Sequence, residues 1–378
     1  MLVDKFTEVD LHPNKVSNHE MGYIFEELLR RFSEMSNETA GEHYTPREVI
    51  QLMVNLLFAE HTKELKGKGI VRTVYDPACG TGGMLTTAKE HTFKNINQDV
   101  QVDMYGQELN EQTYAISKSD VLIMGEKANN IVQGSSFSKD GFKGQRFDFM
   151  LSNPPFGVSW KKEQAFMKEE ANDPNGRFHA GLPRINDGAL LFLQHMISKM
   201  ETRGSRIAII FNGSPLFTGD AGSGESDIRK WIIENDWLET IVAMPNDLFY
   251  NTGIATYIWI VTNNKPARRR GKVQLINAVD KFAKMRKSLG SKRNYMTNEQ
   301  IKEITKSYTA FEEGKTCKIF DNDNFGFTKV VVENPLIKNG KIVKDKQGNT
   351  KPDSSLRDSE KIPLKQDIDA YFEKELGK

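Results

Sequence analysis

The chain has 378 residues and a nearly balanced charge, with 52 basic and 51 acidic side chains, a net charge of +1 and a mean hydropathy of −0.55. Its longest apolar runs, such as 207–211 and 254–261, are much shorter than the roughly 20 residues that span a bilayer, and residues 1–19 lack the apolar core of a secretory signal. We therefore expect a cytoplasmic protein without a membrane span. The charge balance neither indicates nor excludes nucleic acid as a partner.

Cysteine and histidine usage argues against a metal site. The two cysteines, Cys79 and Cys317, are too few for a disulfide framework and lack CxxC or Cys/His spacing. The seven histidines lack ligand spacing such as HxxxH, and we expect His43, His179 and His195 to be hydrogen-bonding or surface residues. The sequence therefore predicts no metal.

The first 70 residues predict a helical segment. Apolar residues recur at helical spacing over 21–35, which indicates a helix there. Segment 45–48 (Thr-Pro-Arg-Glu) has the form of a capping box with proline at the first helical position. A second helix is therefore expected over 46–57, with Thr45 capping its amino end and Glu48 reaching back to the Thr45 N–H.

From residue 71 the pattern alternates between strand and helix, which indicates a mostly parallel sheet covered on both faces. We expect an α/β, doubly wound, Rossmann-like catalytic domain over 71–280. A charged helical region over 281–308 opens the remaining segment, 281–378, whose charged tail is expected to face solvent or to dock onto another subunit. The expected strands are 71–75, 102–105, 130–132, 147–151, 206–211, 238–243, 255–261 and 273–278, and the expected helices are 83–91, 111–124, 188–200 and 226–235.

A glycine-rich segment, 76–84 (Asp-Pro-Ala-Cys-Gly-Thr-Gly-Gly-Met), connects the first expected strand to a helix. Glycines let a backbone turn tightly and approach a ligand, and the helix amino end beyond them offers unpaired N–H groups. The segment lacks the Lys-Ser/Thr ending of a phosphate-binding loop and the GxGxxG spacing of dinucleotide enzymes. It predicts a cofactor loop, and an ordinary strand-to-helix turn is the alternative.

An acidic residue, Glu108, ends the next expected strand. An acid at this distance beyond the glycine loop of a nucleotide-binding α/β fold commonly binds the ribose hydroxyls. Taken alone, Glu108 fits equally well as an acid that the macrodipole favours at a helix start.

The segment 153–156 (Asn-Pro-Pro-Phe) follows another expected strand and should project into the same crevice. Its prolines fix φ and remove two donors, which leaves the Asn153 side-chain oxygen and the Pro154 carbonyl as acceptors beside the ring of Phe156. Two acceptors beside an aromatic ring, here called the acceptor ledge, suit an exocyclic amino group on a planar ring. The alternative is a rigid loop that only ends a strand. Together with the glycine loop and Glu108, the acceptor ledge points to methyl transfer from S-adenosylmethionine to a ring-borne or amide nitrogen.

The motifs GEHYTPRE (41–48), DPACGTGG (76–83), YGQE (105–108) and NPPF (153–156) closely resemble those of the modification subunits of type I restriction-modification systems. These are adenine-specific N6 DNA methyltransferases. The likeness runs over about 21–262 and continues more loosely into the tail.

The resemblance implies S-adenosylmethionine as the cofactor and a flipped adenine as the target base. In related enzymes an aspartate before the NPPF strand often contacts the cofactor adenine, where this chain has Ser135. The implied catalytic residues are Asn153, Pro154, Pro155 and Phe156. The implied cofactor-binding residues are Glu42, His43, Tyr44, Thr45, Pro46, Arg47, Asp76, Ala78, Cys79, Gly80, Thr81, Gly82, Gly83, Met84 and Glu108.

The resemblance also implies partners: double-stranded DNA, a specificity subunit that selects the sequence, and a restriction subunit, with two modification subunits for each specificity subunit. The family usually starts with a helical domain of about 100 residues or more, which we expect to be absent here, as in a fragment or a split subunit. For DNA contact, the basic runs 268–272 and 281–293 are candidates, and solvated surfaces are the alternative.

Two other functions remain open from sequence. A glutamine or RNA methyltransferase can use the same acceptor ledge. A non-catalytic DNA-binding or partner-binding scaffold can keep the same fold. The intact Gly80, Gly82, Glu108 and Asn153 argue against it.

Overall fold

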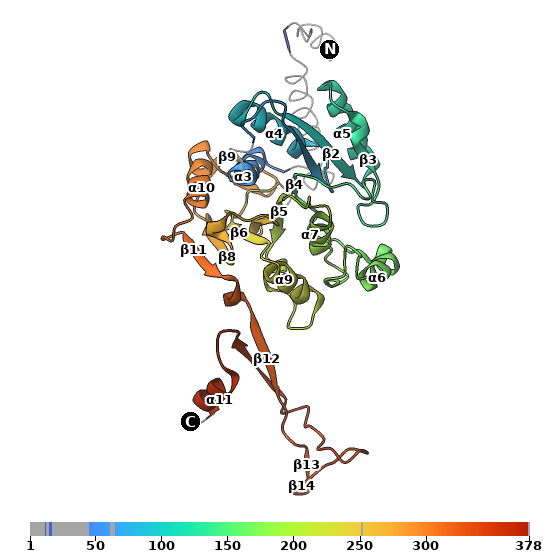
Figure 1. Cartoon of the computed structure of the whole chain (residues 1–378), viewed down its shortest axis with the longest axis vertical. Coiled ribbons are helices and arrows are strands. Elements are labelled where there is room, and N and C mark those ends of the chain that lie inside the picture. Colours follow the sequence, from blue (N-terminus) through green and yellow to red (C-terminus); the bar gives the residue numbers. More distant parts are fainter. Residues whose placement is uncertain (1–11, 13–14, 17–44, 61–64, 251, 377–378) are drawn as a thin grey trace. The chain divides into compact units, whose positions relative to one another are not determined.

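The computed structural model describes residues 12, 15–16, 45–60, 65–250 and 252–376 (Figure 1). The helix predicted over 21–35 lies outside these residues. The chain divides into two compact units between Ile319 and Phe320, and each unit is described by itself.

Within the described part of the larger unit, nine strands form one sheet in the order β11-β8-β6-β7-β5-β4-β1-β2-β3. Every neighbouring pair from β5 to β3 is parallel, as are β6 and β8, whereas β7 runs antiparallel to β5 and β6. This confirms the doubly wound, mostly parallel sheet. The strands are β1 (Val71–Asp76), β2 (Gln101–Glu108), β3 (Ile131–Gln133), β4 (Phe149–Ser152), β5 (Arg206–Asn212), β6 (Leu238–Ala243), β7 (Thr256–Thr262), β8 (Lys272–Asn277) and β11 (Cys317–Asp321).

Helices cover both faces of this sheet (Figure 1). Ala208 and Ile210 of β5 share one core cluster with helices α3 and α10, whereas the buried Ile207 and Ile209 alternate to the opposite face, where α7 packs against β5. In the described part of the larger unit the helices are α3 (Arg47–Phe58), α4 (Gly83–His91), α5 (Glu111–Ile123), α6 (Gln164–Asn172), α7 (Ala189–Ser198), α8 (Ser214–Phe217), α9 (Gly224–Glu234) and α10 (Asn298–Ala310).

The order of the strands places a topological switch point at the carboxyl edge of the sheet. From β1 the chain proceeds outward through β2 and β3, and then returns to β4 on the other side of β1. The carboxyl ends of β1 and β4 therefore border the switch point of the sheet, where open α/β folds bind their ligands.

The prediction of a helical region over 281–308 is wrong for the first half of that range. Strands β9 (Ala283–Leu289) and β10 (Lys292–Tyr295) pair there as an antiparallel hairpin around Gly290, whose φ is +58°. Only α10 is helical, and a capping box between Thr297 and Gln300 starts it. Charged residues on a solvated hairpin resemble those on an exposed helix, because neither pattern has a continuous apolar stripe.

The smaller unit is an extended β structure. Strands β12 (Phe327–Val332) and β15 (Asp358–Pro363) pair antiparallel, β13 (Ile337–Lys338) pairs with β14 (Lys341–Ile342), and helix α11 (Ile368–Leu376) follows. Most of its side chains are exposed. Across the described residues of both units, none of the helices has the length and apolar character needed to cross a bilayer.

Candidate active site

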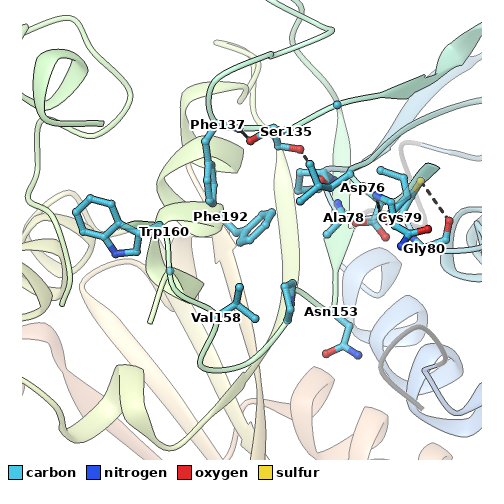
Figure 2. A pocket seen from close by; sticks show the side chains of 18 of the residues that line it. Asp76, Ala78, Cys79, Gly80, Ser135, Phe137, Asn153, Val158, Trp160 and Phe192 are labelled. Atoms are coloured by element: carbon cyan, nitrogen blue, oxygen red, sulfur yellow. Dashed lines mark hydrogen bonds between the residues drawn. The ribbon is translucent and has the colours of Figure 1, made fainter. Parts of the chain in front are cut away.

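A cavity of about 1220 Å³ opens at the carboxyl ends of β1, β2, β3 and β4 (Figure 2). Most of the predicted site residues meet in its wall, namely Thr45, Asp76, Ala78, Cys79, Gly80, Thr81, Gly83, Met84, Glu108, Asn153 and Pro155. Others lie beside it without lining it, namely Pro46, Arg47, Gly82, Pro154 and Phe156. Glu42, His43 and Tyr44 lie outside the described residues.

The glycine loop depends on left-handed backbone. Gly80 has a φ of +55° and Gly82 a φ of +87°, a region that L side chains rarely adopt. Gly82 precedes α4, and a Cβ atom there would lie 2.9 Å from the hydroxyl of Ser117 in α5. Gly82 is thus needed for the turn and for the packing of α5, while the loop around it faces the cavity.

The acidic residues fix the loop by accepting backbone hydrogen bonds. Glu108 accepts from the N–H of Gly80 at 2.9 Å through Oε2 and from that of Asn110 at 2.8 Å through Oε1. Asp76 accepts from the Ala78 N–H at 2.9 Å and from the Ser152 hydroxyl at 2.8 Å, which ties the end of β1 to the end of β4. Burial raises the pKa of Asp76 to about 7, against the lowering effect of these hydrogen bonds.

The side chain of Asn153 is only half paired. Its Nδ2 donates to the hydroxyl of Thr45 at 3.0 Å, whereas its Oδ1 is inaccessible to solvent and has no hydrogen-bond partner among the described residues. The capping box predicted over 45–48 is therefore wrong. Pro46 stands at the N-cap of α3 without a side-chain cap bond, and Glu48 pairs with the buried Lys292.

An aromatic pair flanks this segment. The ring of Phe156 lies 6.4 Å from that of Phe249, edge to face at 76°. Phe249 lies beyond the end of β6, at the carboxyl edge of the sheet, and is buried. The sequence assigned it no role, although an apolar pair that follows a strand at this edge is a usable signal.

The far wall of the cavity comes from segments that the sequence did not assign to the site. Figure 2 shows Phe137, Phe192, Val158 and Trp160 on the side opposite Asp76. The rings of Phe137 and Phe192 lie 4.6 Å apart. These residues come from three separate stretches of the chain, so only the fold brings them together.

Arg177 and His195 form a hydrogen-bond network with the backbone of this wall. Arg177 donates to the carbonyls of Ser136 at 2.8 Å and Phe137 at 2.5 Å, and it lies 2.8 Å from His195 Nδ1. Because a guanidinium only donates, Nδ1 accepts and Nε2–H donates to the Tyr75 hydroxyl at 3.0 Å. Burial and then Arg177 lower the pKa of His195 well below its usual value. His195 is thus a hydrogen-bonding residue, as predicted.

His179 is also a hydrogen-bonding residue, since its Nδ1 lies 2.7 Å from the carbonyl of Gly176. His43 lies outside the described residues. Among the described residues, no cluster of three or more His, Cys, Asp or Glu side chains is suited to a metal ion.

In the basic run 268–272, a candidate for DNA contact, Arg269 is buried inside the protein, whereas Arg268, Arg270 and Lys272 are exposed. Arg269 is fully buried and donates to Gln274 Oε1 at 2.8 Å and to the Tyr308 carbonyl at 2.5 Å. Arg268 and Arg269 both pair with Glu60. The DNA-contact hypothesis is therefore wrong for Arg269, whose guanidinium is occupied.

Comparison with known proteins identifies several relatives. The type I restriction enzyme MjaIX methylase subunit of Methanocaldococcus jannaschii is 29% identical over 345 residues, which cover 90% of this chain and 58% of that protein. The type I restriction enzyme HindI methylase subunit of Haemophilus influenzae is 30% identical over 260 residues, 68% of this chain and 54% of that protein. The chain spans about half the length of the curated relatives it matches.

Solved structures agree with the fold. The type I restriction-modification system methyltransferase subunit from Streptococcus thermophilus superimposes with a TM-score of 0.70 at 25% identity, over 85% of this chain and 64% of that one. A putative class I S-adenosylmethionine-dependent methyltransferase from Listeria monocytogenes gives 0.54 at 18% identity, over 72% of this chain and 76% of that one, and supports the fold alone. The predicted methyltransferase-type sheet is thus confirmed.

The family described as N-6 DNA methylase matches residues 16–347, which include the whole nine-stranded sheet and the cavity at its switch point. The family match and the superposition over 85% of the chain agree with the resemblance that the four motifs predicted. This chain belongs to the N-6 DNA methylase family.

Proposed function

We propose that this chain transfers a methyl group from S-adenosylmethionine to N6 of adenine in double-stranded DNA, as the modification subunit of a type I restriction-modification system. The observation that carries the proposal is the buried Oδ1 of Asn153, which lacks a partner among the described residues, on a residue that lines the same cavity as the glycine loop. An unpaired buried acceptor costs about 1–3 kcal/mol, so a donor on a ligand is its natural partner. Relatives named as type I restriction enzyme methylase subunits support this reaction.

The residues around the cavity fit the proposed cofactor. Glu108 gives one acceptor site on each carboxylate oxygen to a backbone N–H, and a carboxylate has about four such sites, so acceptors remain for the ribose hydroxyls. The volume of about 1220 Å³ exceeds the roughly 300–1,000 Å³ of common small-ligand pockets, which leaves room for an extruded base beside the cofactor. When bound, the cofactor supplies an electrophilic methyl group on a positively charged sulfur.

Asn153 and Pro154 would then prepare the nucleophile. The Asn153 Oδ1 and the Pro154 carbonyl accept the two hydrogens of the adenine amino group, which draws the nitrogen lone pair out of ring conjugation toward the methyl group. The N–C bond forms as the S–C bond breaks, and the extra proton on nitrogen leaves to water. Phe156, with Phe249 at its edge, provides the apolar face for the base. Because the acceptors matter most when charge develops on nitrogen, they act mainly in the transition state.

Contacts to the DNA backbone would come from the rim of the cavity. Lys139, Lys161 and Lys162 line the cavity, are exposed, and take part in no ion pair in the described part of the chain. These cations contrast with Arg269, which is buried and paired. A lysine whose charge is not compensated binds phosphate without first breaking an internal bond.

The partners belong to the same proposal. The chain would work in the cytoplasm with a specificity subunit, which chooses the DNA sequence, and with a restriction subunit, at two modification subunits per specificity subunit. The candidate docking region is the exposed smaller unit, Phe320–Lys378, together with the charged segment before it. Residues 71–280 would form the catalytic domain, and residues 1–70 the helical segment.

The test is a methylation assay on unmethylated genomic DNA with labelled S-adenosylmethionine, with and without a candidate specificity subunit, read by nucleoside mass spectrometry. N6-methyladenine that appears only with the partner is the expected result. If the chain binds the cofactor but methylates only glutamine or RNA substrates, the DNA assignment is refuted, and turnover on none of them would indicate a non-catalytic scaffold.

A further inference from the structure

The hydroxyl of Thr45 binds Asn153 and does not cap the helix that follows it. Thr45 directly precedes the N-cap residue of α3, yet α3 has no side-chain cap, and the Thr45 Oγ1 accepts the Nδ2–H of Asn153 at 3.0 Å instead. A missing cap costs a helix about 1 kcal/mol. The bond joins residues 108 positions apart in the sequence. A tertiary contact therefore replaces the helix-capping bond that the sequence predicted for this hydroxyl.

The orientation of the Asn153 amide decides whether the site can work. The oxygen and nitrogen ends of an asparagine side chain have nearly the same shape, so packing alone does not choose between them. With the nitrogen on Thr45, the oxygen is the end left without a partner among the described residues. The reversed amide would present two N–H donors to an amino group that is itself a donor, and the pair could not form a hydrogen bond.

We infer that Thr45 is a positioning residue, which holds the amide of Asn153 with its oxygen turned toward the target amino group. The inference rests on the proposed function. A threonine hydroxyl has one donor and two acceptor sites, and it fixes the amide only while its own proton goes elsewhere. Thr45 lines the cavity, and no described residue accepts that proton. The carboxylate of the proposed cofactor is an acceptor of the right chemistry, so a bound cofactor would lock Thr45 as the acceptor for Asn153.

The experiment compares Thr45→Val, which keeps the shape and removes the hydroxyl, with Thr45→Ser, which restores it. The expected loss in kcat for Thr45→Val is about tenfold, the effect of one lost hydrogen bond, and Thr45→Ser recovers most of it. Calorimetry should show cofactor binding about tenfold weaker for Thr45→Val, because the bond to the cofactor carboxylate is lost as well, so kcat is compared at saturating cofactor. Thr305→Val, which removes a hydroxyl bonded only to the Ile301 carbonyl in α10, is the matched control and should change neither quantity.

A second comparison separates positioning from a general structural effect. In an Asn153→Ala background, Thr45→Val should cause no further loss, because the group that it positions is gone. In cofactor-free protein labelled with ¹⁵N-asparagine, the Asn153 side-chain amide signals, identified by their loss in Asn153→Asp, should exchange with water faster in Thr45→Val.

Three results overturn the inference: a normal rate in Thr45→Val at every cofactor concentration, an equal loss in both backgrounds, or a loss of rate that saturating cofactor abolishes. The last result would make Thr45 a cofactor ligand only. A wild-type complex that binds the cofactor and DNA but forms no N6-methyladenine would refute the proposed function instead, so the two failures are distinguishable.

Discussion

The two sides of the cavity differ in how completely their polar groups are paired. On the β1–β2 side, both oxygens of Glu108 and one oxygen of Asp76 already accept hydrogen bonds from their own chain. On the β4 side, the side-chain oxygen of Asn153 has no partner among the described residues, and the two prolines that follow it cannot donate. The first side is organised before any ligand arrives. The second side leaves the Asn153 Oδ1 unpaired among the described residues, and this is where we place the chemistry.

The largest effect should follow from removing that acceptor. Asn153→Ala should lower kcat by about 10²–10³-fold, as the loss of one preorganised group at a site of developing charge does in other enzymes. The thermal midpoint should stay near that of the wild type. Steady-state methylation of genomic DNA measures the change, and turnover within threefold of the wild type would contradict the assigned role.

A change on the paired side should instead disturb binding and folding together. Gly82→Val places a β-branched residue at a φ of +87° and its Cβ against Ser117, which should cost about 1–3 kcal/mol of stability and weaken cofactor binding. Gly69→Val is the matched control, because Gly69 has a φ of +69° but open space around it. Thermal unfolding and calorimetry check both variants. Unchanged cofactor affinity in Gly82→Val would exclude the loop from the binding site.

A smaller effect should come from pH. The pKa of Asp76 is raised to about 7 in the folded protein, above its unfolded value near 3.9, so the stability that it contributes is present at low pH and fades as pH rises through about 7. Asp76→Asn cannot ionise, so its thermal midpoint should fall less than that of the wild type between pH 4 and pH 8, by a few degrees, with most of the difference arising below pH 7. Asp99→Asn, at an exposed carboxylate, should behave like the wild type. Parallel pH profiles of Asp76→Asn and the wild type would contradict the raised pKa.

The smallest effect should be seen at the rim. Replacing Lys161 and Lys162 by glutamine should reduce the slope of log Kd for duplex DNA against log salt by about 2, at about 0.9 per phosphate contact, without changing cofactor affinity. The double replacement of Lys143 and Lys168, which are exposed but do not line the cavity, is the control. Equal slopes in the two double variants would move the DNA path away from this rim.

Much of the fold follows from local pattern. The strands expected over 71–75 and 238–243 and the helix over 83–91 agree with β1, β6 and α4 to within one residue, because buried strands and amphipathic helices have distinct periodicities. The hairpin at 283–295 was missed, since a solvated hairpin lacks an apolar stripe, and its buried residues, such as Lys292, are polar.

The site was predictable only where its residues are contiguous. The glycine loop, Glu108 and Asn153 belong to local motifs at strand ends, and the topology brings them to one edge. Phe137, Trp160 and Phe192 come from separate segments and carry no local signal. The role of Thr45 was missed for a related reason, because a capping pattern describes a local bond and its actual partner is Asn153.

The most direct test of the contrast between the two sides is a calorimetric titration of S-adenosylmethionine into the wild type, Asn153→Ala and Glu108→Ala. We expect Asn153→Ala to bind like the wild type and Glu108→Ala to bind at least about tenfold more weakly, because the loss of an acceptor that pairs with ligand hydroxyls costs at least one charged hydrogen bond. Weak binding by Asn153→Ala together with normal binding by Glu108→Ala would contradict the account.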